Sequence, residues 1–235
     1  MAVALLLQGR ADYAATHALQ AELVARRARD EIDDVLLLLE HAEVITLGRK
    51  KGAEQSLVAP GSVPVVEVER GGDATWHGPG QLVAYPIVKL EGGRADLHLH
   101  LHSLEDAVTA LLARWGLAGQ RDERNTGVWL PAPEGPPQKV CSIGIACRRW
   151  VTWHGLALNL DVDLARFGII QPCGFDASVM TRVADHLSPC PSLGDAMTQL
   201  IPPLVTALEL PELRAIHTVP ANLSADNAAE LATVG

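Results

Sequence analysis

A glycine-rich block in the first half of the chain sets the strongest limit on how the chain folds. Within eleven residues, from Arg70 to Gly80, the sequence has four glycines and one proline. The block stands between a valine-rich run, Val65 to Val68, and an apolar run, Leu82 to Val88. Glycine allows positive φ angles and lets a ligand approach the backbone closely. The pattern therefore predicts a strand, a glycine loop and a second strand.

Polar side chains are interleaved with these glycines. Arg70, Thr75 and His77 bring hydrogen-bond donors to the same loop. A turn-rich hairpin is the ordinary alternative for a glycine-rich segment. The interleaved polar side chains favour a ligand-binding loop over that alternative.

A second motif pairs a lysine with a cysteine. Lys139 opens the sequence KVCSIG, and Cys173 stands in the sequence PCG, 34 positions later (173 minus 139). A free thiol has a pKa of about 8.5, so little of it is ionised at neutral pH unless a cation stabilises the thiolate. The pair therefore predicts a cysteine nucleophile that a lysine ionises. Taken alone, a cysteine is more often a buried hydrophobe, and a lysine more often a solvated charge.

Cys141 is a rival nucleophile, because it lies two residues from Lys139. On an extended strand these two side chains share a face, so both are expected to face one pocket. Cys173 is favoured over it, because Cys173 lies in a loop flanked by proline and glycine, whereas Cys141 lies inside an apolar strand.

Four blocks, in order, resemble the lipoyl(octanoyl) transferases, also called octanoyl-carrier-protein:protein N-octanoyltransferases. The blocks are RGGDATWHGPGQLVAYP from Arg70, KVCSIG from Lys139, RRWVTWHGLALNL from Arg148 and PCG from Pro172. The resemblance runs from about residue 36 to about residue 185, which is most of the chain. It implies an α/β fold of the α+β type, a mixed sheet packed with helices, as in the biotin and lipoate protein ligases.

The resemblance also implies roles for individual residues. Cys173 is implied to take the octanoyl group as a thioester, and Lys139 to lower the pKa of that thiol. Three positions, Ile45, Trp76 and Cys141, depart from the residues usual in the family. They bear on the preferred acyl chain more than on the reaction. The residues implied to line the acyl pocket are Arg70, Gly71, Gly72, Asp73, Ala74, Thr75, Trp76, His77, Ser142, Ile143, Gly144, Gly155, Leu156 and Ala157.

The implied reaction moves an octanoyl group from octanoyl-acyl carrier protein to the lysine of a lipoyl domain, in lipoate biosynthesis. The implied acceptors are the lipoyl domains of 2-oxoacid dehydrogenase complexes and the glycine cleavage H protein. Transfer from thioester to thioester and then to an amide needs no cofactor, ATP or metal. Two alternatives remain open: an ATP-dependent lipoate or biotin ligase on the same fold, which needs no cysteine at position 173, and a catalytically silent carrier-binding protein.

Composition predicts a cytoplasmic enzyme that binds neither membrane nor nucleic acid. Four cysteines are too few for a disulfide framework in 235 residues, and reduced thiols indicate the cytosol. No apolar run approaches the roughly 20 residues of a membrane span, and the apolar start, Met1 to Leu7, is expected to be a strand rather than a signal peptide. A net charge of -9 argues against nucleic acid as the main partner.

Three basic clusters interrupt this acidic chain. They are Arg49 to Lys51, Arg121 with Arg124, and Arg148 with Arg149. Solvated surface charge is the ordinary interpretation of any one cluster. Because acyl carrier proteins and lipoyl domains are typically acidic, at least one cluster is expected to steer a carrier.

The length suits one large domain, expected over residues 1–219, followed by a polar tail, 220–235, for which disorder is one alternative. Helices are expected from Ala11 to Arg29, from a cap at Ser103 to about Trp115, and from Ser192 to Leu200, where Pro202 and Pro203 would interrupt the last one. Strands are expected at Val35 to Leu39, about Val140 to Ala146, and Val151 to Leu160.

Three alternating histidines, His98, His100 and His102, suggest a metal site at first sight. On an extended strand the outer two would stand about 13 Å apart, too far for one zinc ion to bind all three. In a helix only His98 and His102 would share a face. The tract is therefore expected to be a surface segment before the helix, without a metal.

Overall fold

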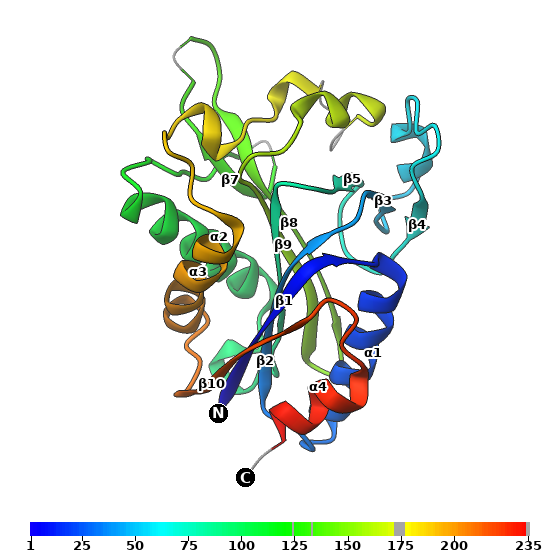
Figure 1. Ribbon diagram of the computed structural model, residues 1–235, viewed down its shortest axis with the longest axis vertical. Helices are drawn as coiled ribbons and strands as arrows, with labels where there is room; N and C mark the ends of the chain where they lie inside the picture. The colour runs from blue at the N-terminus through cyan, green and yellow to red at the C-terminus, as the bar shows by residue number, and fades with distance from the viewer. Residues whose placement is uncertain (124, 133, 172–176, 234–235) are drawn as a thin grey trace.

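The structure is a computed structural model that describes residues 1–123, 125–132, 134–171 and 177–233 (Figure 1). Its centre is a seven-stranded mixed sheet with the order β10-β1-β2-β6-β9-β8-β7. Strand β1 pairs in parallel with β10 and β2, and the other neighbours are antiparallel. The strands are β1 (Ala2–Ala11), β2 (Asp34–His41), β6 (Gln81–Ile87), β7 (Gly127–Leu130), β8 (Gln138–Arg148), β9 (Val151–Asn159) and β10 (Leu213–Pro220).

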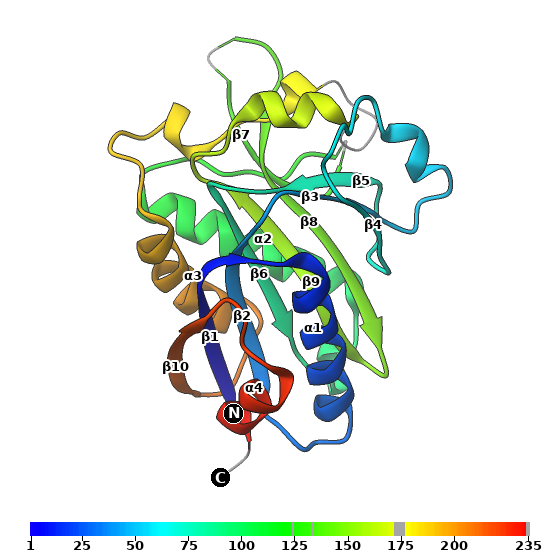
Figure 2. The same ribbon diagram turned by 45° about the vertical axis from the view of Figure 1, so that its right-hand side comes forward.

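Helices cover both faces of this sheet (Figures 1 and 2). Helices α2 (Leu97–Arg114) and α3 (Leu193–Ala207) pack on one face, and α1 (Tyr13–Ala28) and α4 (Ala225–Ala232) on the other. Successive side chains of a strand point to opposite faces. In β1, Ala2, Ala4 and Leu6 enter the core under α2 and α3, whereas Val3, Leu5 and Leu7 enter the core under α1 and α4. This two-sided burial explains why the strands are continuously apolar.

A small second sheet stands at one end of the large one, near the labels β3 to β5 in Figure 2. Its central strand β3 (Val44–Leu47) pairs in parallel with β4 (Val65–Glu67) and antiparallel with β5 (Ala74–His77). The glycine-rich block therefore contains a strand of its own, β5, between the two predicted strands. Short 3-10 helices lie at Ala53–Ser56, Gly92–Arg94, Leu164–Ile169, Ala177–Val179 and Val183–Asp185.

The predicted fold class, a mixed sheet packed with helices, is confirmed. The predicted helix from Ala11 is α1, and the predicted strands at 35–39, 140–146 and 151–160 are β2, β8 and β9. In the part of the chain that the structure describes, no helix is long and apolar enough to cross a membrane.

The predicted start of the second helix is wrong. Helix α2 begins at Leu97, and the Asp96 carboxylate caps it by accepting hydrogen bonds from the amides of His98 (2.7 Å) and Leu99 (3.2 Å). Ser103 lies inside the helix and donates its hydroxyl to the Leu99 carbonyl oxygen. The histidine tract is therefore helical, and His100 is buried while His98 is exposed.

The predicted end of α3 and the predicted tail also need correction. Helix α3 runs through Pro202 and Pro203 to Ala207, with Ser192 as its cap. Residues 225–232 of the expected tail form α4, whose residues Ala228, Ala229 and Ala232 are buried against the face that carries α1. The small alanine side chains allow this close packing. The sequence did not predict it, because most other residues of the segment are polar.

Candidate active site

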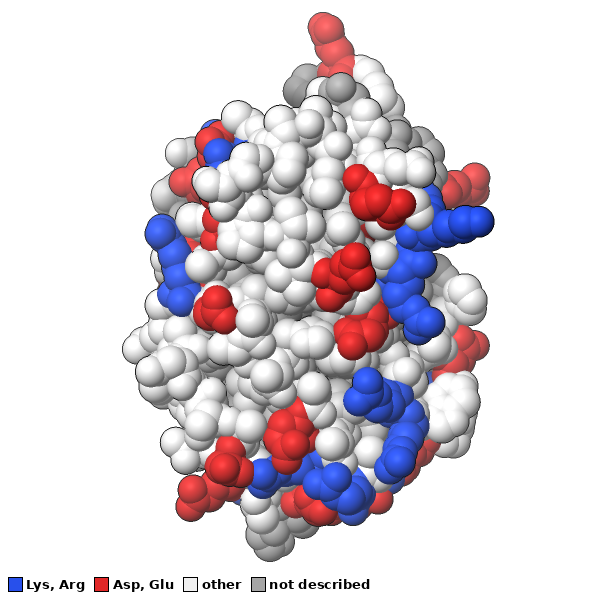
Figure 3. Space-filling model, turned by 90° about the vertical axis from the view of Figure 1, so that its right-hand side faces the viewer, with Lys and Arg blue, Asp and Glu red and all other residues white. Residues whose placement is uncertain are grey.

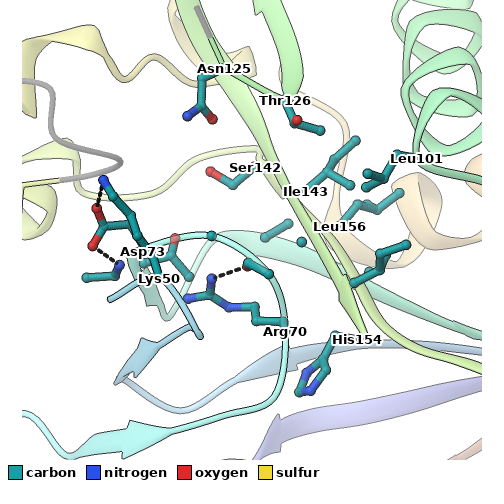
Figure 4. A pocket seen from close by; sticks show the side chains of 18 of the residues that line it. Lys50, Arg70, Asp73, Leu101, Asn125, Thr126, Ser142, Ile143, His154 and Leu156 are labelled. Carbon is teal, nitrogen blue, oxygen red and sulfur yellow. Dashed lines mark hydrogen bonds and ion pairs between the residues drawn. The ribbon is translucent and has the colours of Figure 1, made fainter. Parts of the chain in front are cut away.

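A cavity of about 420 Å³ lies where the glycine-rich block meets strands β8 and β9 (Figure 4). Its volume falls in the range of pockets that hold small ligands. Most residues predicted to bind the acyl chain line this cavity, and so does Lys139. The predicted residues in its wall are Arg70 to Thr75, His77, Ser142 to Gly144 and Gly155 to Ala157. The structure thus brings together three sequence blocks that are up to 87 residues apart (157 minus 70).

Trp76 is the described exception, because it does not line the cavity. Strand β5 alternates, so that Thr75 and His77 face the cavity while Trp76 points to the other side. The indole is 1% exposed, packs edge-on against Phe167, and donates its Nε1–H to Glu43 Oε1 at 2.9 Å. Its place is in the core of the small sheet.

Arg70 fixes the glycine loop to the small sheet. Its guanidinium donates to the Thr46 carbonyl oxygen (2.8 Å), the Thr46 hydroxyl (2.8 Å) and the Gly71 carbonyl oxygen (3.1 Å). The amide of Gly71 donates to the Ile145 carbonyl oxygen of β8 at 2.9 Å. Backbone approaches of this kind need glycine: a Cβ on Gly48 would lie 2.3 Å from the Gly72 carbonyl oxygen.

Asp73 lines the cavity as a buried, ion-paired carboxylate. Its oxygens accept hydrogen bonds from Lys50 Nζ, from the Ser56 hydroxyl and from the Ala74 amide, at 2.7, 2.7 and 2.8 Å. Burial alone would raise the pKa of this carboxyl, but the hydrogen bonds outweigh burial and lower it. Asp73 is therefore ionised at neutral pH and organises the loop; Figure 4 shows its contact with Lys50.

Lys139 is 3% exposed, which is unusual for a lysine side chain. Its Nζ donates to Asn125 Oδ1 at 2.6 Å and stands 5.4 Å from the centre of the Trp129 ring. The chain of the lysine crosses Gly127, where a Cβ would lie 2.6 Å from its Cε. Neighbouring residues thus hold the ammonium group at the cavity wall.

Four aromatic side chains gather in one part of the cavity wall. Tyr13, Tyr85, His77 and His154 line it. Burial lowers the pKa of His77 and of His154 to about 3, and raises the pKa of Tyr13 to about 12. At neutral pH these aromatic groups are therefore neutral, although the Arg70 guanidinium is close enough to act on all four of them.

Sequence comparison places this site in a known family. The profile of the lipoyl protein ligase A/B catalytic domain matches residues 12–204. The chain belongs to this family. An octanoyltransferase of Chloroflexus aggregans is 39% identical over 214 residues, which cover 88% of this chain and 96% of the relative. An octanoyltransferase of Gloeobacter violaceus is 46% identical over 165 residues, covering 70% of this chain and 72% of the relative. The predicted family, and with it the acyltransferase class, is confirmed.

Solved structures of the lipoyl protein ligase family share the fold. A bipartite lipoate protein ligase of Thermoplasma acidophilum superposes with a TM-score of 0.71 and 17% identity, covering 98% of this chain and 91% of the other. A lipoate-protein ligase A bound with ATP gives a TM-score of 0.70 and 16% identity, covering 98% and 93%. At such identities the likeness shows the fold alone.

Lys139 lines the cavity, but Cys141 does not. The prediction that the two side chains lie on the same face of the strand is therefore wrong. On β7, Val128 and Trp129 are adjacent, and they pair with Cys141 and Lys139 of β8. Val140, which lies between these two residues of β8, is therefore an extra residue without a partner on β7. Such a bulge reverses the alternation of side chains. The Cys141 side chain is fully buried in the core under α2, and burial raises its pKa to about 12. A thiol in this environment is not ionised at neutral pH.

Cys173 lies outside the described residues, but residues on either side of the gap are placed. Before it, the amide of Gln171 donates to the Ser56 carbonyl oxygen at 2.7 Å. After it, Val179 lines the cavity, and the amide of Thr181 donates to the Lys139 carbonyl oxygen at 2.9 Å.

Several residues of the cavity wall were not predicted from the sequence. They include Tyr13, Lys50, Tyr85, Asn125 and His154. Tyr85 and His154 stand inside the sequence blocks that resemble the family, so they could have been predicted as residues of the site. Tyr13 at the start of α1 and Asn125 before β7 are far from every block, and only the fold brings them to the site.

One cluster of described residues has metal-binding side chains. His17, Glu69 and His154 offer three atoms that lie within 4.8 Å of one another. His17 Nε2 is hydrogen-bonded to Glu69 Oε2 at 2.9 Å, and His154 Nε2 is 3.9 Å from the same oxygen. The distances that zinc requires, about 2.0 to 2.2 Å, run from each ligand atom to the ion and not between the ligand atoms. In this structure only His17 and Glu69 are hydrogen-bonded to each other, and the buried Nε2 of His154, a residue of the cavity wall, has no hydrogen-bond partner among the described atoms.

Proposed function

We propose that this protein transfers an octanoyl group from octanoyl-acyl carrier protein to the lysine of a lipoyl domain, by way of a thioester on Cys173. The observation that carries the proposal is the cavity, whose wall holds both a buried lysine and a group of neutral aromatic side chains, in a chain whose relatives are octanoyltransferases. The acceptors would be the lipoyl domains of 2-oxoacid dehydrogenase complexes and the glycine cleavage H protein. Residues 1–219 would form the single catalytic domain, with α4 packed against it, and the enzyme would act in the cytoplasm.

In the first step, the ammonium of Lys139 stabilises the thiolate of Cys173. The thiolate attacks the carbonyl carbon of the donor thioester, and the bond from that carbon to the carrier's sulfur breaks. The carrier leaves as a thiol after taking up a proton, and the octanoyl group remains on Cys173. A nearby cation lowers the pKa of a thiol, which is why a buried lysine suits this role.

In the second step, the amine of the acceptor lysine attacks the octanoyl-enzyme thioester. The amide forms, the bond from carbon to the Cys173 sulfur breaks, and the thiol is regenerated. Lys139, left neutral once it has given its proton to the departing carrier thiolate, takes the proton that the amine loses. The energy of the donor thioester suffices for both steps, so the proposal requires neither ATP nor a metal.

The glycine-rich block would bind the acyl chain between the small sheet and β8. Ser142, Ile143 and Gly144 would form one wall, and Gly155 to Ala157 the next. The aromatic part of the wall, with Tyr13 and His154, would receive the methyl end of the chain. Trp76 is left out of this proposed pocket, because it lies in the core of the small sheet.

Basic side chains near the cavity would receive the acidic carrier. Lys50 belongs to the predicted cluster Arg49 to Lys51 and lines the cavity, although it is also paired with Asp73. Figure 3 shows basic side chains along one margin of the face that it presents, with acidic ones beside them. Such a margin raises the rate at which an oppositely charged partner arrives, and salt weakens the effect.

The test is intact-protein mass spectrometry after mixing the enzyme with octanoyl-acyl carrier protein, without ATP. We expect one added octanoyl group on the wild type and on Cys141→Ser, released by hydroxylamine, and none on Cys173→Ser. Adding a lipoyl domain should then move the group to the domain's lysine.

Two results would favour the alternatives. Transfer only when ATP and free octanoate are supplied would make the protein a ligase. Binding of the carrier without an adduct, and without any effect of Cys173→Ala, would make it a silent carrier-binding protein.

A further inference from the structure

A buried carboxylate on α2 contacts the segment that leads into β7. Glu105 is 4% exposed and does not line the cavity. Its Oε1 accepts a hydrogen bond from the amide of Gly127 at 2.9 Å. Its Oε2 accepts from Arg121 Nε at 2.7 Å, and from His102 Nδ1 at 3.0 Å when that nitrogen carries the proton. One side chain thus binds the helix, the loop after it and the first residue of β7.

The loop between Gln120 and Trp129, to which Glu105 binds, is also held by hydrogen bonds between its own two ends. Gln120 and Trp129 exchange two backbone hydrogen bonds, each of 2.9 Å. The Trp129 indole donates its Nε1–H to the Asn125 carbonyl oxygen at 3.2 Å. Arg121 also donates to the His102 carbonyl oxygen (3.0 Å) and to Asp106 (2.7 Å), which ties the start of the loop to α2.

Lys139 meets this segment through three of its residues. Asn125 Oδ1 accepts from the lysine Nζ at 2.6 Å, the Trp129 ring centre stands 5.4 Å from Nζ, and Gly127 leaves the space that the lysine chain crosses. Figure 4 shows Asn125 and Thr126 on the same side of the cavity as Ser142. The place of the ammonium group therefore depends on the place of residues 125–129.

We infer that Glu105 is a positioning residue for the transfer reaction: from outside the cavity, it holds residues 125–129 where Asn125 and Trp129 receive the ammonium group of Lys139. This inference rests on the proposed function, in which Lys139 ionises Cys173. Hydrogen bonds to a carboxylate are shorter and stronger than those between neutral groups. A rigid helix that carries the carboxylate can therefore fix a loop that has little regular structure, and a small displacement of a catalytic group reduces the rate strongly.

The charge on Glu105 matters for this role because Arg121 supplies only donors. Replacing Glu105 by glutamine keeps an oxygen that can accept from the Gly127 amide. The glutamine NH₂ group, however, would face the Arg121 guanidinium, so that two donors meet where a carboxylate oxygen accepted. We expect the loop to shift and the hydrogen bond from Lys139 Nζ to Asn125 Oδ1 to be lost.

The experiment measures the rate at which iodoacetamide alkylates Cys173 between pH 5 and pH 9, with peptide mass spectrometry to separate this cysteine from Cys141, Cys147 and Cys190. The wild type is compared with Glu105→Gln, Asn125→Ala and Lys139→Ala. The matched control is Asp106→Asn, because Asp106 binds the same Arg121 but not Gly127. Thermal unfolding of each variant is recorded in the same buffers.

We expect Lys139→Ala to raise the apparent pKa of the Cys173 thiol. Glu105→Gln and Asn125→Ala should raise it in the same direction, with about a threefold to tenfold lower alkylation rate at pH 7, where tenfold is one pKa unit. Asp106→Asn should stay within about twofold of the wild type, as its exposed ion pair contributes little. If Glu105→Gln does not fold, Arg121→Gln takes its place, because it removes the donor to Glu105 Oε2 from a partly exposed position.

Two outcomes must be kept apart. If Lys139→Ala leaves the pH profile unchanged, the proposed role of Lys139 is wrong, and the proposed function needs revision. If Lys139→Ala moves the profile but Glu105→Gln and Asn125→Ala leave it at the wild-type value, the inference about Glu105 is overturned. A lower melting temperature without a moved profile would likewise show that Glu105 serves stability only.

Discussion

Three buried histidines around the cavity are held without charge. Burial lowers the pKa of His41 to about 4, and that of His77 and His154 to about 3. Hydrogen bonds fix two of the tautomers. His41 Nδ1–H donates to the Ala11 carbonyl oxygen, so its Nε2 accepts from the Tyr85 hydroxyl at 2.8 Å. His77 Nδ1–H donates to Gln81 Oε1 at 2.8 Å.

Because these folded-state pKa values lie below the unfolded value of about 6.5, the unfolded chain binds more protons between them. Stability is therefore complete above about pH 6.5 and is lost as the pH falls. We expect the free energy of unfolding to drop by about 1 to 2 kcal/mol per histidine between pH 7 and pH 5. Urea unfolding at these two pH values measures the drop.

The matched variants are His41→Gln and His217→Gln. His41→Gln should remove part of the pH dependence, because its histidine is fully buried, whereas His217 lies partly exposed on β10 and should leave the dependence unchanged. An equal stability at pH 7 and pH 5 in the wild type would contradict the neutral histidines.

Position 127 requires glycine, both because of its backbone conformation and because neighbouring atoms leave no room for a side chain. Its φ of +135° is rare for other residues, and an added Cβ would lie 2.3 Å from the Cys141 carbonyl oxygen and 2.6 Å from Lys139 Cε. Gly127→Ala should therefore destabilise the fold by at least about 1 kcal/mol and reduce transfer. The control is Gly194→Ala in α3, where a Cβ meets nothing within 4 Å and should be neutral or stabilising. Equal melting temperatures for the two variants would refute this account.

The sequence located most residues of the site but not which way each points. The blocks around Arg70, Lys139 and Gly155 line the cavity as a group. Strict alternation along β8 placed Cys141 beside Lys139, and the bulge at this point moves it into the core. A bulge depends on the pairing with β7, which no local pattern in β8 reveals.

At the scale of the elements, the start of α2 is decided by its cap. Asp96 accepts from two free amides of the first turn, and these hydrogen bonds, first that from Leu99 and then that from His98, lower its pKa. Ser103 donates back to Leu99 within the helix and caps nothing. Asp96→Ala should therefore lower the melting temperature by about 2 to 4 °C, and Ser103→Ala should leave it nearly unchanged.

Differential scanning calorimetry at pH 7 compares the two variants. The loss in Asp96→Ala should shrink in acid, as the wild-type carboxyl takes up a proton and its hydrogen bonds weaken. A larger effect of Ser103→Ala than of Asp96→Ala would restore the start predicted from the sequence.

The two prolines of α3 show the limit of local propensity. Proline lacks the amide hydrogen that a helix interior needs, which predicts an end near Leu200. The helix continues because Leu200, Ile201 and Leu204 are buried in the core shared with α2. Tertiary packing therefore outweighs the missing hydrogen bonds, and a single sequence does not reveal which partner supplies that packing.

At the scale of the whole molecule, the cavity and the helix α4, which contributes to stability, lie at opposite ends of the large sheet. Helix α4 lies at the end of the large sheet that carries both described termini, whereas the small sheet and the cavity stand at the other end (Figure 1). The order of the strands, which creates this separation, was not readable from the sequence, because apolar runs identify buried strands but not their neighbours.

Removing α4 tests this separation. A chain ended at Pro220 loses the buried Ala228, Ala229 and Ala232, the ion pair between Arg26 and Asp226 (2.5 Å), and the hydrogen bond from the Asp33 amide to the Ala232 carbonyl oxygen (2.9 Å). The apolar face that α4 covers, on α1 and β1, would then meet water. We expect the melting temperature to fall by roughly 5 to 10 °C, since about 2 to 4 kcal/mol of burial is lost in a chain of this size.

The same truncated chain should still form the octanoyl adduct at a temperature well below its melting point, because no residue of the cavity wall belongs to α4. A chain ended at Thr233 keeps α4 and serves as the control for both measurements. An unchanged melting temperature after removal of residues 221–235 would mean that α4 adds nothing to the core. A folded truncated chain without an adduct would mean instead that the C-terminal helix reaches the site through the sheet.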